Sequence, residues 1–557
     1  NIPSIFSQAG YLIIKQKIVG SKGNIQFLPY IVAFQNGSLE NPDDPSSAFD
    51  NELGWPTVGL SAKYGIASNL TLDLAVNPDY SQIESDAVMI DVNTTYALYY
   101  PEKRPFFLEG IDMFESEINA VYTRSINDPL IAARLTGKIG RTNIGYIIAG
   151  DQHTPWTIPF EERSYSVSSD RKSVSNVLRI KQDILEDSFL GFILTDREVN
   201  ESFNRVTGFD GRIKFLKNYF LSFQGLGSWT GEPDDSLLFA GASNLTFGNM
   251  NYTSAFDGER FNGAAYEFGL SRSARLWNFS TWFNSYSPEF RADNGFIGKN
   301  NYREAGLWTG LHFYPNKWGI VETQPQVSAG IIRNFNGILK HWWINPNIWI
   351  NFIRQTHFSM WSSLGSERYE DTMFKGKWSL GMNLNNSYSK AVVAGIWLGF
   401  GKSINYYADP PALGFYQNIG LWGEVKPIEK FRASISFNRY EMLESRGGKK
   451  SLYQDAFRNT LTYQFSKHLS FRLVAQYKYT EIAAYDYEKY EFQIDPLISY
   501  ELNPFTVFYI GSNHDLEKFD VPYGTREKNH QIFLKLQYQF RSTPDDLSGK
   551  VRGLLER

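Results

Sequence analysis

Residues 531–540 read Gln-Ile-Phe-Leu-Lys-Leu-Gln-Tyr-Gln-Phe, in which apolar and polar side chains alternate and Phe533 is the exception. Successive side chains of a β-strand point to opposite faces, so this stretch would have one apolar face and one polar face. The apolar face would consist of Ile532, Leu534, Leu536, Tyr538 and Phe540. The same alternation recurs along most of the chain. It is typical of transmembrane β-barrel strands, whose apolar face meets lipid and whose polar face meets the lumen.

The composition agrees with a large all-β membrane protein. The chain has 557 residues, 16% of them aromatic, and its mean hydropathy is −0.35. No apolar run approaches the ~18 residues of a membrane-spanning helix, whereas aromatic girdles are a feature of barrels. A large soluble all-β protein is the alternative, but the motif repeat of ~40–50 residues that a propeller needs is not visible. The absence of cysteine excludes disulfides and thiolate metal sites, and a net charge of −4 gives no reason to expect nucleic acid as a partner.

Turns and loops predict the strand number and the orientation. Short polar turns such as 217–218, 355–356 and 466–468 alternate with longer connections rich in Gly, Asp, Asn and Ser. The longer connections are 37–55, 152–173, 231–261, 287–300, 408–414, 444–451 and 518–526. In outer-membrane barrels the short turns are periplasmic and the long loops extracellular. Pairing the runs through the short turns predicts about 24 strands, within a range of about 22 to 26, with the N-terminus on the periplasmic side.

The alternation also predicts which side chains face the lumen. In the run 469–480, Leu473 and Tyr477 would face lipid, whereas Gln476 and Lys478 would face inward. Two pairs of tryptophans lie at either end of the hairpin that turns at 355–356, and we expect them in the aromatic belts at the membrane interfaces. They are Trp342 and Trp343, and Trp349 and Trp361.

One segment does not suit the barrel wall. Residues 78–130 lie between the predicted strands 70–77 and 131–139 and contain two prolines and four charges within 101–110. Proline is poorly tolerated inside a sheet, and a barrel of this size has a lumen too wide for its wall side chains to fill. We therefore expect 78–130 to fold into the lumen as a plug; a long extracellular loop is the alternative.

Two motifs in this region carry a resemblance. They are Asn77-Pro78-Asp79-Tyr80-Ser81-Gln82-Ile83-Glu84-Ser85-Asp86 and Tyr100-Pro101-Glu102-Lys103-Arg104-Pro105-Phe106-Phe107-Leu108-Glu109-Gly110. At this spacing they resemble a large Bacteroidota outer-membrane β-barrel family of unknown function, over about residues 10–540. Its members usually carry a β-sandwich similar to family-9 carbohydrate-binding modules before the barrel. The resemblance implies a location and an architecture, and the family offers no settled activity.

Combined with this resemblance, the sequence divides into three parts. Residues 1–30 resemble the join between sandwich and barrel, so we interpret residues 1–25 as a periplasmic lead-in whose upstream sandwich is missing. Residues 26–540 would form the barrel together with the lumenal segment 78–130. Residues 541–557 would form a periplasmic tail, either disordered or with a short amphipathic helix, and Phe540 would end the last strand.

The sequence carries little catalytic or metal-binding chemistry. None of the seven histidines stands at zincin spacing, and there is no Gly-x-Ser-x-Gly elbow, so we expect no enzyme. Asp43, Asp44 and Asp50 are weak Ca²⁺ candidates, and a solvated loop is the favoured explanation because they lack the spacing of an EF-hand loop. Charged plug residues, chiefly Arg104 and Glu109, would pin the plug by ion pairs worth ~0–1 kcal/mol each.

Three functions remain open. The favoured one is a plugged, non-enzymatic outer-membrane barrel that serves as a subunit or scaffold of an envelope complex for secretion or outer-membrane protein assembly. The alternatives are a gated channel for a large solute such as an oligosaccharide, and a surface enzyme built from loops. Expected partners are outer-membrane lipid and lipopolysaccharide, together with lipoproteins or another barrel. Both termini would be periplasmic.

Overall fold

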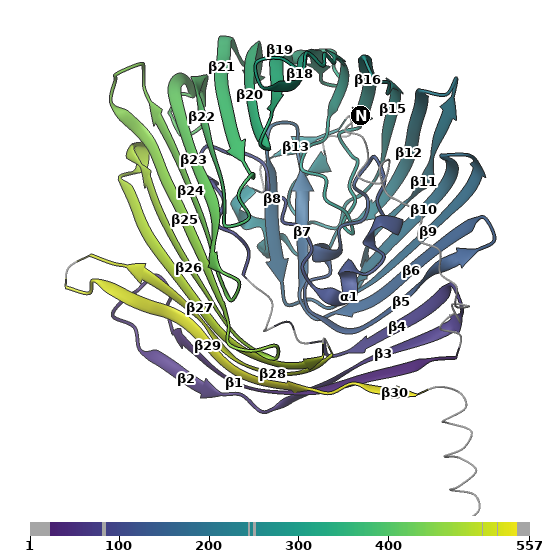
Figure 1. Ribbon diagram of the computed structural model, residues 1–557, viewed down its shortest axis with the longest axis vertical. Coiled ribbons are helices and arrows are strands. Elements are labelled where there is room, and N and C mark those ends of the chain that lie inside the picture. The colour runs from purple at the N-terminus through teal and green to yellow at the C-terminus, as the bar shows by residue number, and fades with distance from the viewer. Residues whose placement is uncertain are drawn as a thin grey trace, which may run out of the picture.

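The computed structural model describes residues 23–542 apart from 79, 81–84, 243–244, 249–251, 504 and 521. Within this part of the chain, 24 antiparallel strands form one closed barrel, as the alternation predicts. The interpretations of 1–22 and of 543–557 lie outside the described residues. The wall strands (Figure 1) are β1 (Ile25–Leu39), β3 (Thr57–Ala67), β4 (Leu70–Val76), β5 (Pro129–Ile139), β6 (Thr142–Asp151), β9 (Ser173–Leu185), β10 (Ser188–Val199), β11 (Ser202–Phe215), β12 (Tyr219–Gly231), β15 (Arg260–Arg272), β16 (Trp277–Tyr286), β17 (Tyr302–Leu311), β18 (Ile320–Arg333), β19 (Leu339–Phe352), β20 (Thr356–Tyr369), β21 (Thr372–Asn386), β22 (Val392–Asn405), β23 (Ala412–Ile428), β24 (Phe431–Leu443), β25 (Lys450–Gln464), β26 (Leu469–Ile482), β27 (Tyr487–Asn503), β28 (Thr506–Lys518) and β29 (Thr525–Gln537).

The barrel closes between its first and last long strands. β1 pairs with β29 through residues 30–38 and with β3 through residues 25–32. Two short strands, β2 (Phe49–Leu53) and β30 (Phe540–Ser542), extend the lines of β3 and β29 along β1. Closure gives each wall strand a partner on both sides, so the barrel has no free sheet edge.

The stretch 531–540 has the two faces that its sequence predicts. Ile532, Leu534, Leu536, Tyr538 and Phe540 are between 42% and 55% exposed on the outer surface. Phe533 faces the lumen and is 3% exposed, because it packs with Tyr30 and Leu497 and covers Gly511. The exception in the pattern is therefore an inward aromatic residue within a local core.

Tight turns join the strands at the short-turn end. Leu216 and Lys217 have φ of 45° and 65°, and Arg354 and Gln355 have φ of 58° and 50°. Two successive residues with positive φ are the mark of the type I′ hairpin turn, whose twist matches that of the strands it joins. These turns are therefore as short as the sequence predicts, although none of the four residues is glycine.

The remaining elements are short. They are α1 (Pro105–Leu108), β7 (Thr154–Pro159), β8 (Ser164–Ser169), β13 (Thr246–Phe247), β14 (Tyr252–Thr253) and the 3-10 helices η2 (Ile111–Met113), η3 (Thr123–Ser125), η4 (Ser236–Ala242) and η5 (Ala483–Tyr485). No helix among the described residues is long and apolar enough to cross a membrane. Figure 1 shows α1, β7, β8 and β13 inside the ring of wall strands.

The connections 152–173, 231–261 and 287–300, which the sequence predicts as long extracellular loops, fold inward into the barrel. Trp156 and Phe256 are buried against the end of β10, and Phe290 is buried in a second cluster with inward residues of β10 to β15. Burying these aromatic side chains stabilises the inward position by about 1.5–3 kcal/mol each, and this free energy would be lost if the segments lay in solvent.

Candidate functional site: the plug and the lumen wall

Four segments pack together in the lumen, and we call them the plug. They are the described parts of 85–128, 152–173, 231–261 and 287–301. Backbone hydrogen bonds link them, with Ser164 N–H donating to the Thr95 carbonyl at 2.9 Å and Tyr122 N–H to the Asn294 carbonyl at 2.7 Å. Segment 85–128 thus lies where the sequence predicts, but it is one of four components.

The motif around Arg104 ties the two ends of segment 85–128 together. Arg104 donates Nε to Glu102 Oε1 at 2.9 Å and Nη2 to Glu102 Oε2 at 2.7 Å. Its Nη1 donates to the Ile126 carbonyl at 2.7 Å, and Thr123 Oγ1 donates to Glu102 Oε2 at 2.7 Å. Burial alone would raise the pKa of Glu102, but the Arg104 and Thr123 hydrogen bonds keep that pKa below its usual value.

The motif residues differ in what they contact. Arg104 pairs within the plug, contrary to the expectation that it pins the plug to the wall. Glu109 does reach the wall, where it pairs with Lys63 of β3 and lies 3.5 Å from Arg134 of β5. Lys103 pairs with Asp86 of the same segment at 3.3 Å.

The remaining motif residues are structural. Pro105 begins α1, Phe107 is buried against inward residues of β5 and β6, and the Phe106 carbonyl accepts a hydrogen bond from Arg134. Asn77 ends β4 and donates Nδ2 to the Val58 carbonyl at 2.9 Å. The ring of Tyr80 lies 5.5 Å from the Arg104 guanidinium, and Pro101, whose carbonyl accepts from Arg124, and Pro78 lie on the connecting backbone. Asp79, Ser81 and Gln82 lie outside the described residues.

Buried charged side chains on β4 to β11 join neighbouring wall strands and hold the plug. Arg134 pairs with Asp73 at 2.9 Å, and Arg179 pairs with Asp210 at 2.5 Å, with both arginine side chains at most 1% exposed. Arg197 of β10 donates to the Ser125 carbonyl at 2.5 Å and to the Pro155 carbonyl at 2.9 Å. Breaking a buried ion pair leaves an uncompensated charge, so such contacts are costly to disrupt.

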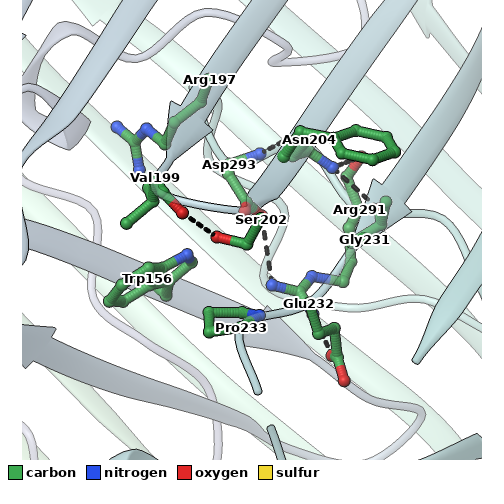
Figure 2. A pocket seen from close by; sticks show the side chains of 12 residues that line it. Trp156, Arg197, Val199, Ser202, Asn204, Gly231, Glu232, Pro233, Arg291 and Asp293 are labelled. Carbon is green, nitrogen blue, oxygen red and sulfur yellow. Dashed lines mark hydrogen bonds and ion pairs between the residues drawn. The ribbon is translucent and has the colours of Figure 1, made fainter. Parts of the chain in front are cut away.

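Figure 2 shows one of these joints, where segment 287–301 meets β11 and the end of β12. Arg291 Nη1 donates to Glu232 Oε1 at 2.5 Å, and the Asp293 N–H donates to Asn204 Oδ1 at 2.9 Å. The gap between them measures about 10 Å³, so it holds a single water at most. Burial raises the pKa of Glu232 to about 7; Arg291 opposes this shift, and the Glu259, Asp293 and Asp257 carboxylates add to it.

The plug crosses the lumen to the opposite wall through residues 85–93. Asp91 pairs with Lys478 of β26 at 2.7 Å, and Asn93 Nδ2 donates to the Ile404 carbonyl at 2.9 Å. The N–H of Val88 donates to Gln476 Oε1 at 2.9 Å, which confirms the predicted inward direction of Gln476 and Lys478. A cavity of about 480 Å³ lies beside this contact, at the long-loop ends of β26 and β27.

A further contact, which we call the latch, joins the turn between β7 and β8 to the long-loop ends of β19 to β21. Lys340 Nζ lies 2.7 Å from Glu161 Oε1 and also pairs with Glu162. The Glu370 N–H donates to Glu162 Oε2 at 2.6 Å, and Arg163 donates to Tyr369 Oη at 2.9 Å. The cavity left at this contact is about 30 Å³, so the latch is closed to anything larger than a few waters.

The wall from β18 to β23 differs from the wall that carries the buried ion pairs, because tryptophans line it. The plug contacts it mainly at its long-loop ends. Strand pairing places Trp343, Trp349 and Trp361 on the same face as Glu367, which lies in the lumen beside Lys377 and Tyr406. Of the predicted belt residues, only Trp342 faces outward, because Trp343 is its immediate neighbour on the strand. Trp349 is 53% and Trp422 of β23 is 40% exposed, so this part of the lumen remains open.

Candidate metal ligands come together at two places among the described residues. His514, Glu527 and His530 offer ligand atoms within 4.8 Å of one another, and so do Glu232, Asp257 and Glu259. The first group combines imidazole and carboxylate, which suits Zn²⁺ better than Ca²⁺. The sequence shows no metal-site spacing there, since the group forms only when β28 and β29 pair. The weak candidates Asp43, Asp44 and Asp50 do not form such a group; Asp44 accepts from Ser46 instead.

Comparisons with known proteins find one family model and several solved structures that resemble this chain. Residues 24–136 match a family model described as a domain of unknown function (DUF5916). The ferric preacinetobactin receptor BauA of Acinetobacter baumannii is 8% identical, with 94% of this chain and 80% of that chain covered and a TM-score of 0.39. The Pseudomonas aeruginosa ferric enterobactin receptor PfeA is 9% identical, with 94% and 82% covered and a TM-score of 0.45. A BenF-like porin of Pseudomonas fluorescens Pf-5 is 10% identical, with 64% and 100% covered and a TM-score of 0.33.

A comparison with curated proteins gives no match.

Proposed function

We propose that the protein is a non-enzymatic outer-membrane channel whose lumen is gated by the plug. The uncovered wall from β18 to β23 carries this proposal, because Trp349 and Trp422 face the lumen and remain exposed. A solute path runs along this wall and ends at the latch. The apolar outer face of the barrel and its asymmetry of short turns and long connections support the outer-membrane location, with the short turns periplasmic.

The latch is the natural gate. Lys340 is 7% exposed and pairs with both Glu161 and Glu162, so removing its charge deletes two ion pairs that hold the β7–β8 turn to the wall. The turn then keeps hydrogen bonds such as those to Glu370 and Tyr369 at this contact and should leave the wall more readily. The turn belongs to a two-stranded sheet separate from the wall, so it can move without breaking wall hydrogen bonds.

Single-channel recording of the purified barrel in planar bilayers tests this function. We expect Lys340→Ala to raise the mean conductance several-fold. Lys528→Ala is the matched control, because it removes a lysine that pairs with Glu517 at 2.9 Å within the wall alone. Equal conductance in wild type, Lys340→Ala and Lys528→Ala would contradict the gate.

A scaffold or subunit in an envelope complex is the second candidate, and the buried anchors favour it. Arg134, Arg179 and Arg197 hold the plug or its supporting wall with almost no solvent contact, which suits a permanent seal. Gentle purification from native membranes followed by mass spectrometry tests this role. Stoichiometric lipoproteins or a second barrel would support the scaffold, and a lone barrel would leave the channel as the better account.

A further inference from the structure

The uncovered lumen wall repeats one arrangement in which a tryptophan ring lies over a glycine of the neighbouring strand. The pairs on this wall are Trp343 over Gly330, Trp361 over Gly381, Trp397 over Gly420 and Trp422 over Gly395, and Trp282 over Gly306 repeats the arrangement on the adjacent β16 and β17. A Cβ atom at any of these glycines would overlap the ring. Each ring therefore lies flat against the wall, which leaves its other face toward the lumen.

Asparagines stand between these rings. The side-chain oxygens of Asn345, Asn347, Asn383, Asn385 and Asn418 have no hydrogen-bond partner among the described residues. All of them occupy inward positions on the same face as the tryptophans, and two stand directly opposite one: Asn347 pairs with Trp361, and Asn383 pairs with Trp397. Unpaired buried amide oxygens are rare and costly, and rotation about χ2 brings either the acceptor or the donors of an amide to a ligand on the adjacent ring.

On β20 to β22 this wall is uncharged at the level of the tryptophans, and the charged pair Glu367 and Lys377 lies nearer the long-loop end. The inward positions of β20 to β22 at these levels are Ser359, Trp361, Ser363, Ser379, Gly381, Asn383, Asn385, Gly395, Trp397, Gly399 and Gly401. Ions therefore have no counter-charge to bind, in contrast to the wall under the plug. A ligand suited to this surface is neutral, carries many hydroxyl groups and has a flat C–H face to lie on an indole ring.

We propose that the inner wall from β18 to β23 binds neutral oligosaccharides. The sugar rings stack on Trp343, Trp361, Trp397 and Trp422, and their hydroxyl groups exchange hydrogen bonds with the neighbouring asparagines. This inference rests on the proposed channel function and names its solute class. Aromatic rings over glycines also stabilise sheets by themselves, but that role requires neither exposed outer ring faces nor unpaired amides beside them.

An array of neutral oligosaccharides, probed with the full chain in detergent, is the first test, followed by calorimetry with the tightest binder of the array. We expect saturable binding that Trp397→Ala weakens at least tenfold and Trp397→Phe weakens less. Asn418→Leu, which leaves every tryptophan–glycine pair in place, should weaken binding severalfold even if Trp397→Ala fails to fold. The control Trp342→Ala removes an outward ring and should bind like wild type.

Three results would overturn the inference: no neutral oligosaccharide bound by the wild type, unchanged binding in both Trp397→Phe and Asn418→Leu, or equal loss in Trp342→Ala. The outcome is separable from the gate, because binding is measured in detergent without conductance. Binding with a Lys340→Ala barrel that does not conduct would refute the channel and retain the site. Conductance without oligosaccharide binding would retain the channel and refute the binding site.

Discussion

The two halves of the lumen wall follow the same alternation of side chains but carry different inward residues. From β3 to β16 the inward residues include buried arginines and aspartates that pair with each other or with plug backbone. From β18 to β23 they are chiefly tryptophans, glycines, serines and asparagines, and the plug contacts this wall mainly at its long-loop ends, at the latch and through Asn93. Paired ions fix one partner in one geometry, whereas a neutral aromatic surface can accept an exchangeable ligand.

The largest effect should come from breaking a buried pair on the charged half. Arg179→Ala leaves Asp210 buried without its partner, which costs about 3–5 kcal/mol of unfolding free energy. Urea unfolding of the folded barrel, followed by its electrophoretic shift, measures this change. Lys138→Ala is the control, because its pair with Asp183 is exposed, and a similar loss in both variants would erase the proposed difference between buried and exposed pairs.

The pH should change the stability of the charged half through Glu232. Burial raises the pKa of this residue to about 7. A folded-state pKa above the unfolded value means that stability is fully present below about pH 4.5 and falls as the pH rises through about 7, by up to about 3 kcal/mol. Glu232→Gln should therefore lose less stability than wild type between about pH 5 and pH 8. Identical pH dependence of the urea midpoint in both proteins would show that Glu232 is not responsible.

On the neutral half, a methyl group added to a glycine that lies under a tryptophan ring should lower the stability of the barrel. Gly381→Ala places a Cβ against the Trp361 ring and should cost about 1–3 kcal/mol through overpacking. Gly150→Ala on β6 is the control, since nothing lies within 4 Å of its added Cβ. Thermal unfolding that does not separate the two variants would mean that the ring has free space to move.

The smallest effect should come from the exposed link between plug and wall. Glu109 is 58% exposed in its pair with Lys63, so Glu109→Ala should change stability by only ~0–1 kcal/mol. The same urea experiment measures it. A loss as large as that of Arg179→Ala would mean that the plug is fixed by its exposed contacts.

Alternation predicts much of the wall because each strand obeys a local rule. The outward row from Ile532 to Phe540 and the inward Gln476 and Lys478 follow from a period of two. The position of Phe107 inside the lumen follows from prolines and charges that a lipid-facing strand cannot accommodate.

The plug's other components and the tryptophan wall could not be predicted in this way. Segment 287–301 is polar in composition, and its contacts with Asn204 and Glu232, far away in sequence, hold it inside together with the buried Phe290. Tryptophan suits both a membrane interface and a lumen, so the direction of Trp349 depends on strand register rather than on residue type.

Cysteine accessibility tests most directly whether the two halves differ, because the native chain has no cysteine. Ser359→Cys lies on the uncovered wall opposite Trp349, and Ser228→Cys lies under the plug, where Ser228 is 1% exposed. The account predicts that a charged, membrane-impermeant maleimide labels Ser359→Cys in the folded barrel and labels Ser228→Cys only after denaturation. Equal labelling of both folded variants, or protection of both, would contradict a lumen that is covered on one side and open on the other.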